Sequence, residues 1–306
     1  MKLLIIGAGK LGKNFRAALN ESTHREASAI QVSLRADRRG LPKQSDAEVV
    51  LLAVRDGRVA PLAAELAATP WGAKLNAAIH ASGALSASAL DALRGVGVPV
   101  AQLHPMLSFA SERQHLKLGA VADPRFSGGH ALVAGDARAV RVASRIARVV
   151  GLKPRHWEGI DPGLYHAAAA LVANGAAALA SVGAEVLRAA GVPEDRAPDV
   201  LGPLLGSVAF NVSHFGLPGA LTGPVRRGGT AVIASHLAGL NRALPEAADL
   251  YRAVALAQLP LAERLGDASI KDLQQIAALL RSAHTGSSGA SRRGAKPRKR
   301  DTSVRS

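Results

Sequence analysis

The sequence predicts an α/β protein in which a doubly wound, mostly parallel sheet is followed by an all-α domain. Three observations support this fold class. The apolar run at residues 3–6 leads into glycines with G-x-G-x-x-G spacing, strand-like and helix-like segments then alternate as far as residue 149, and residues 162–281 carry an almost wholly helical pattern. Strands that alternate with helices are typical of a parallel sheet covered on both faces.

The expected elements follow one another in order. We expect strands at residues 3–6, 29–34, 49–54, 77–81, 98–103 and 131–134, with helices directly after the first glycines and at residues 58–68, 87–93 and 137–149. In the helical part we expect helix stops or turns at three segments that contain Gly and Pro: Gly191-Val192-Pro193, Leu217-Pro218-Gly219 and Thr222-Gly223-Pro224. The predicted boundaries are 1–152 for the sheet domain, 153–283 for the helical domain and 284–306 for a tail.

The composition restricts the chemistry. The chain has no cysteine, which excludes disulfides, thiolate metal sites and cysteine nucleophiles. Neither an H-E-x-x-H motif nor a G-x-S-x-G motif occurs, so we expect no metal site and no hydrolase site. We expect a cytoplasmic protein, because the first residues run straight into a strand pattern rather than a signal peptide. The Ala-rich stretch at 167–184 is expected to be a packed interior helix rather than a membrane span.

Much of the formal charge of +15 lies in the tail. Residues 284–306 consist mostly of Gly, Ser, Arg and Lys, and such a segment is expected to be disordered because it buries too little apolar surface. A weak, nonspecific contact of this tail with a polyanion is the alternative to a solvated extension.

The glycine motif predicts a Rossmann dinucleotide site within residues 1–152. Gly7 permits the tight turn, Gly9 lets the backbone approach a pyrophosphate, and Gly12 allows close packing of the helix. The intervening Ala8, Lys10 and Leu11 complete the predicted contact segment, and the helix N-terminus supplies N–H donors. The alternative is a purely structural glycine turn.

Arg35 indicates which dinucleotide binds. It follows the second expected strand, where an acidic residue would bind a free ribose hydroxyl and an arginine suits a 2′-phosphate. We therefore predict NADP(H), with Arg38 and Arg39 as possible helpers or as solvated loop residues. After the third strand, Ala53, Val54 and Arg55 are predicted to pass over the nicotinamide half, although Arg55 and Asp56 also suit a helix entry with Asp56 as the cap.

Several short motifs together resemble a known family. They are residues 4–12, His80-Ala81-Ser82-Gly83, His104-Pro105-Met106, Tyr165-His166 with Asn174, and Ala220-Leu221-Thr222-Gly223-Pro224. The chain resembles the bacterial Rossmann-like proteins with a C-terminal domain of unknown function (family 2520), called predicted NADP oxidoreductases. That family is similar to pyrroline-5-carboxylate reductase, 6-phosphogluconate dehydrogenase and ketopantoate reductases. The resemblance implies a C-terminal domain like that of 6-phosphogluconate dehydrogenase. The resemblance implies a reaction type, and similar reductases pair through the long helix, which implies a homodimer.

The candidate proton donor departs from the relatives. In several of them a lysine and an asparagine on the first long helix after the Rossmann domain handle the substrate carbonyl, whereas this helix offers His166 and Asn174. A histidine can donate a proton near neutral pH, and Asn174 lies two turns later, about 12 Å along the axis. The alternative is a capping histidine and a buried asparagine bonded to backbone.

Further polar residues are expected at the mouth of the site. His80 and Ser82 lie at the end of one expected strand, and His104 lies at the end of the next. Each of them is expected either to contact the substrate or the nicotinamide, or to have a structural role. Thr222 and Arg226 lie in an expected turn between helices. There Thr222 would donate a hydrogen bond to the substrate and Arg226 would bind a substrate carboxylate. The alternative is that the two residues only form the corner between the helices.

These expectations combine into one functional hypothesis. We predict an NADPH-dependent oxidoreductase that reduces a small carbonyl or imine acid, with a ketopantoate-like compound as the candidate substrate. His166, Asn174 and His104 are the candidate catalytic residues, and His80, Thr222 and Arg226 the candidate substrate contacts. The alternative is a catalytically inactive NADP-binding sensor or regulatory module.

Overall fold

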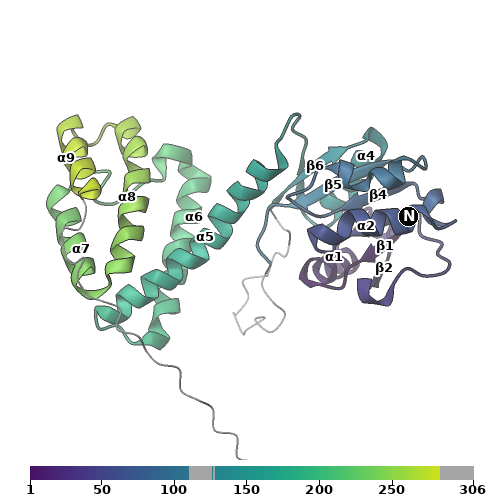
Figure 1. The fold of residues 1–306 in the computed structure, drawn as a ribbon, viewed down its shortest axis with the longest axis horizontal. Coiled ribbons are helices and arrows are strands. Elements are labelled where there is room, and N and C mark those ends of the chain that lie inside the picture. Colours follow the sequence, from purple (N-terminus) through teal and green to yellow (C-terminus); the bar gives the residue numbers. More distant parts are fainter. Residues whose placement is uncertain (110–125, 127, 283–306) are drawn as a thin grey trace, which may run out of the picture. The chain divides into compact units, whose positions relative to one another are not determined.

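The computed structural model describes residues 1–109, 126 and 128–282 (Figure 1). Contacts divide the chain into a first unit, Met1–Ala178, and a second unit, Leu179–Ser306. This division falls inside the long helix α5 (Pro162–Ala189) rather than near residue 152, because the start of that helix packs against the sheet through Tyr165 and His166. The predicted basic tail lies outside the described residues.

The first unit contains one seven-stranded sheet with the order β2-β1-β3-β4-β5-β6-β7. Its strands are β1 (Lys2–Ile6), β2 (Gln31–Arg35), β3 (Val49–Leu52), β4 (Ala77–His80), β5 (Val100–Pro105), β6 (His130–Gly135) and β7 (Lys153–Arg155). All neighbouring strands are parallel except β5 and β6, which are antiparallel. The predicted Rossmann-type α/β fold is therefore confirmed.

Helices cover both faces of the sheet (Figure 1). The helices of this unit are α1 (Lys10–Glu21), α2 (Asp56–Ala67), α3 (Asp91–Arg94) and α4 (Ala137–Val149). Phe15 and Leu19 of α1 and Ile146 of α4 belong to one buried cluster, whereas Leu62 of α2 and Leu93 of α3 belong to another on the opposite face. These two cores explain why β3 and all but the last residue of β4 are apolar, because each of these central strands is buried on both faces of the sheet.

Most predicted elements of this unit are present, with three differences. The segment predicted as a helix at 87–93 is a 3-10 turn followed by the short α3. Strand β7 was not predicted, because Lys153–Arg155 is short, polar and interrupted by Pro154. Arg35 lies within β2 rather than after it, where it pairs with Ile6 of β1.

The chain from Pro162 onward is helical, as predicted. The helices are α5 (Pro162–Ala189), α6 (Ala197–Gly219), α7 (Thr230–Ala243), α8 (Pro245–Leu265) and α9 (Ile270–Arg281). The Gly191–Pro193 and Thr222–Pro224 segments separate helices. Within α6 the backbone is not helical at Gly216 and Leu217, so the helix is interrupted where residues 217–219 were predicted to stop it. Helices α7, α8 and α9 share a core that includes Ile233, Ala255 and Ile276.

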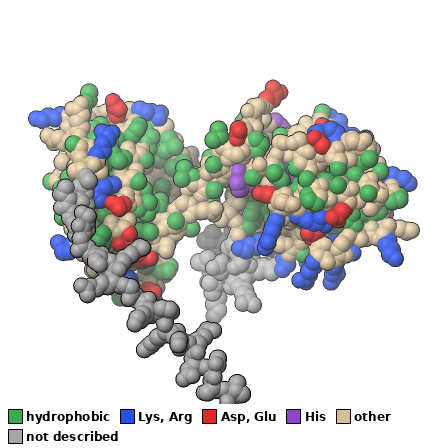
Figure 2. Space-filling view, in the orientation of Figure 1, with side chains coloured by type: hydrophobic (Ala, Val, Ile, Leu, Met, Phe, Trp, Pro, Cys, Tyr) green, Lys and Arg blue, Asp and Glu red, His purple; other side chains and the backbone are tan. Residues whose placement is uncertain are grey.

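Helices α5 and α6 leave large apolar side chains exposed. Leu171 is 77% exposed and Phe215 is 64% exposed, and no residue of α5 is buried. No Asp, Glu, Lys or Arg occurs between Asp161 and Glu185. Apolar side chains reach the surface of these helices in Figure 2. The expectation that 167–184 is a packed interior helix is therefore wrong for a single chain, because no residue of α5 is buried by the residues that the structure describes.

By length and composition alone, two helical segments among the described residues could cross a membrane. They are Pro162–Ala189 and Glu194–Gly219, with mean hydropathies of 1.6 and 1.3. This observation is weak evidence by itself, because long apolar helices also occur in soluble proteins, where another surface covers them.

Candidate active site

The glycine turn after β1 has the geometry that its sequence predicts. Gly7 has a φ of +118°, and a Cβ there would lie 2.2 Å from the carbonyl oxygen of Ala53. A Cβ on Gly12 would lie 1.9 Å from the carbonyl oxygen of Gly7, whereas a Cβ on Gly9 would meet nothing within 4 Å. Gly9 is also the N-cap of α1 and carries no capping side chain. The turn is thus closed toward the protein and open toward a ligand at Gly9.

The loop after β3 lies beside this turn. Ala53 N donates a hydrogen bond of 2.8 Å to Ile6 O, and the virtual Cβ of Gly7 would also approach Val54. Arg55 is the exposed N-cap of α2 and Asp56 is its first residue. The proposed cap role of Asp56 is wrong, since the N-cap position is occupied by Arg55.

Arg35 is partly buried and held by backbone carbonyls. Its Nε donates to Gly40 O at 2.6 Å and its Nη2 donates to Arg39 O at 2.9 Å. These bonds fix the guanidinium at the carboxyl end of β2, close to the glycine turn, whose Gly7 N donates to Arg35 O at 2.8 Å. Arg38 and Arg39 are exposed in the same loop. Many Lys and Arg side chains gather on this part of the first unit in Figure 2.

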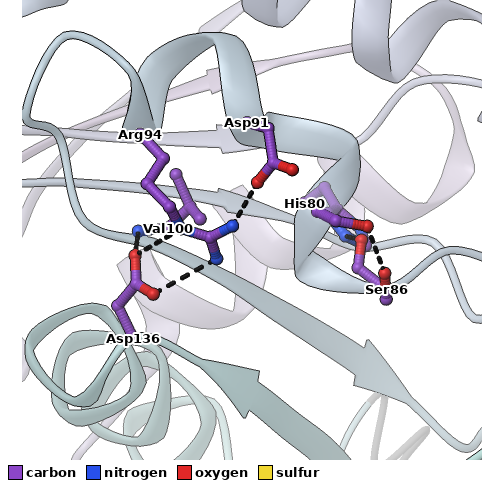
Figure 3. Close-up of polar contacts among 7 residues, drawn as sticks. His80, Ser86, Asp91, Arg94, Val100 and Asp136 are labelled. Carbon is purple, nitrogen blue, oxygen red and sulfur yellow. Dashed lines mark hydrogen bonds and ion pairs between the residues drawn. The ribbon is translucent and has the colours of Figure 1, made fainter.

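His80 is a structural residue in this fold. It is completely buried; its Nε2 lies 2.9 Å from Ser86 O, and its Nδ1 accepts from Ser82 N at 3.2 Å. Figure 3 shows the ring turned toward Ser86. Burial lowers the pKa of His80. The prediction that His80 contacts substrate is therefore wrong for this conformation, because backbone atoms occupy both ring nitrogens.

A network of charged side chains lies in and beside α3, which follows the turn that begins at Ser86, the hydrogen-bond partner of His80. Arg94 lies between the carboxylates of Asp91 and Asp136 (Figure 3). Asp136 also accepts a hydrogen bond of 2.8 Å from Val100 N, at the start of β5. Burial opposes ionisation of Asp136, but the bonds from Arg94 and Val100 outweigh it and lower the pKa of the carboxyl. This network fixes α3 to β5.

Ser82 also has mainly structural partners. Its hydroxyl accepts from Ala84 N at 3.2 Å, and its carbonyl accepts from Gln102 Nε2 at 2.8 Å. The side chain is buried. These bonds shape the turn at Ala81–Ala84, and the predicted contact of Ser82 with the cofactor stays a prediction.

Two histidines converge above Gly83. A Cβ built on this buried glycine would lie 2.6 Å from His104 Nε2 and 2.6 Å from His166 Nδ1. The two rings meet edge to face, with centroids 5.8 Å apart. Both rings therefore pack closely on Gly83, and this position accepts no side chain unless the rings move. The sequence placed His104 and His166 in the site but gave Gly83 no role, although its place in the His80–Gly83 motif was a signal.

Tyr165 supports this pair. Its hydroxyl lies 3.3 Å from His104 Nδ1, and its ring meets the imidazole edge to face. Burial raises the pKa of Tyr165, so that the phenol stays protonated at neutral pH. Burial and the neighbouring His166 lower the pKa of His104 to about 4, while the charge of Asp56 has a smaller opposite effect. His104 is therefore a neutral imidazole at neutral pH.

The other predicted site residues lie outside this cluster. Asn174 is exposed on α5, two turns beyond His166 and about 12 Å along the axis. Arg226 forms an ion pair with Asp267 and donates to Leu221 O at 2.9 Å, so its predicted pairing with a substrate carboxylate meets an existing partner. Thr222 is exposed in the second unit, and its predicted substrate contact stays a prediction.

A cavity of about 520 Å³ lies on β5 and β6 of the first unit. Gln102 of β5 lines it, as does Leu132 of β6, which is the register partner of His104. Trp157 and Glu158 line it from the segment after β7. Its volume suits a small ligand. Among the described residues, no group of three or more His, Asp or Glu side chains is placed to hold a metal ion.

Comparison with known proteins supports the resemblance found in the sequence. The family model described as "Domain of unknown function (DUF2520)" matches residues 130–258, which confirms the resemblance over that part of the chain. No curated protein matches the sequence significantly.

Solved structures share the fold. Protein TM1727 from Thermotoga maritima is 22% identical, with a TM-score of 0.63 over 85% of this chain and 99% of that one. BF3122 from Bacteroides fragilis, named as a candidate NADP oxidoreductase, is 20% identical, with a TM-score of 0.60 over 84% and 97%. Pyrroline carboxylate reductase from Plasmodium falciparum with NADP bound is 10% identical, with a TM-score of 0.52 over 91% and 98%. At these identities the likeness establishes the fold.

Proposed function

We propose that this protein is an NADPH-dependent oxidoreductase that reduces a small carbonyl or imine acid, with a ketopantoate-like compound as the candidate substrate. One observation carries the proposal: the open glycine turn and the convergent His104 and His166 both lie at the carboxyl edge of the same sheet. In open α/β sheets this edge is where dinucleotides and their substrates bind.

The residues at this edge fit NADPH. The uncapped N-terminus of α1 at Gly9 offers backbone N–H groups to a pyrophosphate, and a side chain at Gly7 or Gly12 would collide with backbone. Arg35 is oriented by its two carbonyl contacts and retains Nη1, which makes no hydrogen bond within the described residues, for a 2′-phosphate. Val54 and Arg55 are close enough to the turn to border the nicotinamide half.

The histidine pair would act on the substrate. Bound NADPH supplies a hydride for the carbon of the substrate. His104 or His166 would donate a hydrogen bond to the heteroatom of that bond, which stabilises the negative charge that develops on it. The 520 Å³ cavity is proposed to take an uncharged part of the substrate, because its charged lining residue, Glu158, would repel a carboxylate.

A spectrophotometric screen tests this function. Purified full-length protein is mixed with NADPH and a panel of small oxo acids, including ketopantoate, and of cyclic imine acids. We expect oxidation of NADPH with at least one compound, and a loss of that activity in His166→Gln. Tight NADPH binding without turnover of any compound would reject this substrate class and favour the sensor.

We also propose a cytoplasmic homodimer that pairs through α5 and α6. The support is the exposure of Leu171, Val172 and Phe215 on helices that carry long uncharged stretches. Large apolar side chains exposed in this way are unfavourable in water and are typical of an interface. A membrane is the competing cover for the same helices, and the two differ in their response to detergent.

A further inference from the structure

The loop that follows β2 contains a carboxylate besides its arginines, and the partner of this carboxylate lies on another element. Asp37 begins the turn Asp37–Arg39, shortly after Arg35. On the basis of the proposed function, we propose that Arg58 of α2 is a positioning residue for the choice of dinucleotide. It holds the carboxylate of Asp37 on α2, so that the loop favours the 2′-phosphate of NADPH over the free ribose hydroxyl of NADH.

An acidic side chain in this loop opposes the binding of NADPH. A carboxylate beyond the second strand accepts hydrogen bonds from the free ribose hydroxyls of NAD, and it repels a 2′-phosphate. The turn that contains Asp37 also holds Arg35, because Gly40 O and Arg39 O accept from its guanidinium at 2.6 and 2.9 Å. The carboxylate and the proposed phosphate ligand therefore belong to one small loop, and an unpartnered Asp37 would favour NADH.

Arg58 provides the missing partner. Its Nε lies 3.2 Å from each carboxylate oxygen of Asp37, so both oxygens are engaged by a residue of α2. The side chains of Asp37 and Arg58 are each 31% exposed, so the pair is partly shielded from solvent. In this arrangement the carboxylate is bound to a cation that lies 21 residues later in the sequence, and it is not free to accept from a ribose.

Arg58 acts through Asp37 rather than on the nucleotide itself. Its Nη1 and Nη2 donate to Oε1 and Oε2 of Glu65 at 2.6 and 3.0 Å, so every nitrogen of the guanidinium has a carboxylate partner. The hydrogen bonds to Glu65 and Asp37 raise the pKa of Arg58, which keeps the guanidinium charged. Because Glu65 lies about two turns later on α2, this helix itself orients the guanidinium whose Nε holds Asp37.

The other arginines of the loop are available to an anion. Arg38 and Arg39 are exposed, and their side chains have no hydrogen-bond or ion-pair partner among the residues that the structure describes. Asp37 is the only acidic residue in the segment 27–45. Once Asp37 is paired with Arg58, the remaining charges of this loop are positive, and the 2′-phosphate is the part of NADPH that such a loop attracts.

Titration of the full-length protein with NADPH and with NADH tests the proposal. The measured quantity is the ratio of the two dissociation constants. We expect Arg58→Gln to lower the preference for NADPH about tenfold, because the freed carboxylate repels the phosphate and accepts from the ribose of NADH. In the double variant Asp37→Asn/Arg58→Gln the preference should return to within about threefold of the wild type, because asparagine carries no charge that needs a partner. The side chains of both residues are partly exposed, so the variants should fold.

Two further variants separate this role from a purely structural one. Arg94→Gln is the matched control, because Arg94 also lies between two carboxylates of the first unit but outside the β2 loop, and it should leave the ratio unchanged. Arg58→Lys keeps a cation beside Asp37 and should shift the ratio less than Arg58→Gln. If the ion pair were only structural, Asp37→Asn would be as harmful as Arg58→Gln and both would weaken the two nucleotides alike. That result would overturn the proposal.

The outcomes also distinguish this inference from the proposed function. A wild type that prefers NADPH, together with an Arg58→Gln variant whose ratio is unchanged, would overturn the role of Arg58 but leave the proposed NADPH-dependent activity intact. A wild type that binds neither nucleotide, or that prefers NADH, would contradict the cofactor of the proposed function and, with it, the inference about Arg58.

Discussion

Apolar side chains are buried in the strands of the first unit but exposed on the helices α5 and α6. Ile5, Leu51 and Ile79 are fully buried between helices, whereas Leu171 and Phe215 are mostly exposed to solvent. The sheet is complete within one chain, but the long helices are not. The difference shows that one part of the molecule forms a buried core by itself, while the other exposes apolar side chains that a second surface would cover.

The same contrast applies to the glycines. Gly7, Gly12 and Gly83 lie where any side chain would collide with an atom nearer than 3 Å, whereas Gly57 and Gly175 are surrounded by open space. A glycine in the first group is required by its surroundings, and a helical glycine in the second group only weakens its helix. Substitutions by alanine should therefore separate the two groups clearly.

The largest effect is expected for Gly12→Ala. Its Cβ would lie 1.9 Å from Gly7 O, which must move and so distort the turn. We expect a loss of roughly 3–5 kcal/mol in the free energy of unfolding, together with the loss of NADPH binding. Urea denaturation measures the first and fluorescence titration the second. Gly57→Ala, in α2, should be neutral or stabilising by about 0.5–1 kcal/mol, and equal effects of the two variants would break the comparison.

Gly83→Ala should affect activity more than folding. The new methyl group meets the ring atoms of His104 and His166, which are side chains that can turn aside. We expect turnover to fall by about 100-fold, or roughly 2.7 kcal/mol in the barrier, while NADPH binding is kept. Gly175→Ala, in α5, is the control with open surroundings. An unchanged kcat in Gly83→Ala would show that turnover does not depend on the present positions of the two histidine rings.

A charge on the exposed helices should disrupt the dimer. In Leu171→Glu and Phe215→Glu, a carboxylate would be buried without a partner in the proposed interface. Light scattering after size-exclusion chromatography should show a dimer for the wild type and a monomer for both variants. Val96→Glu changes an exposed apolar residue of the first unit and should leave the dimer intact. The proposed dimer would be contradicted by a wild-type protein that is monomeric or that is soluble only in detergent.

The smallest of these effects is the pH dependence of stability. The pKa of His104 falls from its usual 6.5 to about 4 on folding, so the folded protein favours the neutral ring. This stabilising contribution is complete above pH 6.5 and is lost as the pH falls toward 4, with a size of about 1–3 kcal/mol. His80 acts in the same direction. Unfolding midpoints between pH 7 and 4 should fall less steeply in His104→Gln; an identical slope argues against the burial of a neutral His104.

The sequence predicted the sheet unit well because its signals are local. The apolar runs, the glycine spacing of residues 7–12 and the arginine at position 35 are each recognised from a few neighbouring residues. Strand β7 was missed because it is a polar three-residue segment that becomes a strand only through pairing with β6.

The candidate site was predicted less completely, because its geometry is tertiary. His80 and His104 both lie at the ends of apolar strands. Only the fold shows that His80 is bonded to backbone atoms, whereas His104 contacts Gly83 and Tyr165. Arg226 was expected to be free, but its partner Asp267 lies 41 residues later in the sequence. The exposure of α5 likewise could not be inferred, since its composition suits a buried helix and an interface helix equally.

The central claim, that the glycine turn and Arg35 form an NADPH site, is tested most directly by titration of the full-length protein with NADPH and NADH. The account predicts that the wild type binds NADPH more tightly than NADH, and that Arg35→Ala weakens NADPH binding by about tenfold, or roughly 1.4 kcal/mol, without affecting NADH. Binding of neither nucleotide, or equal losses for both in the variant, would contradict it.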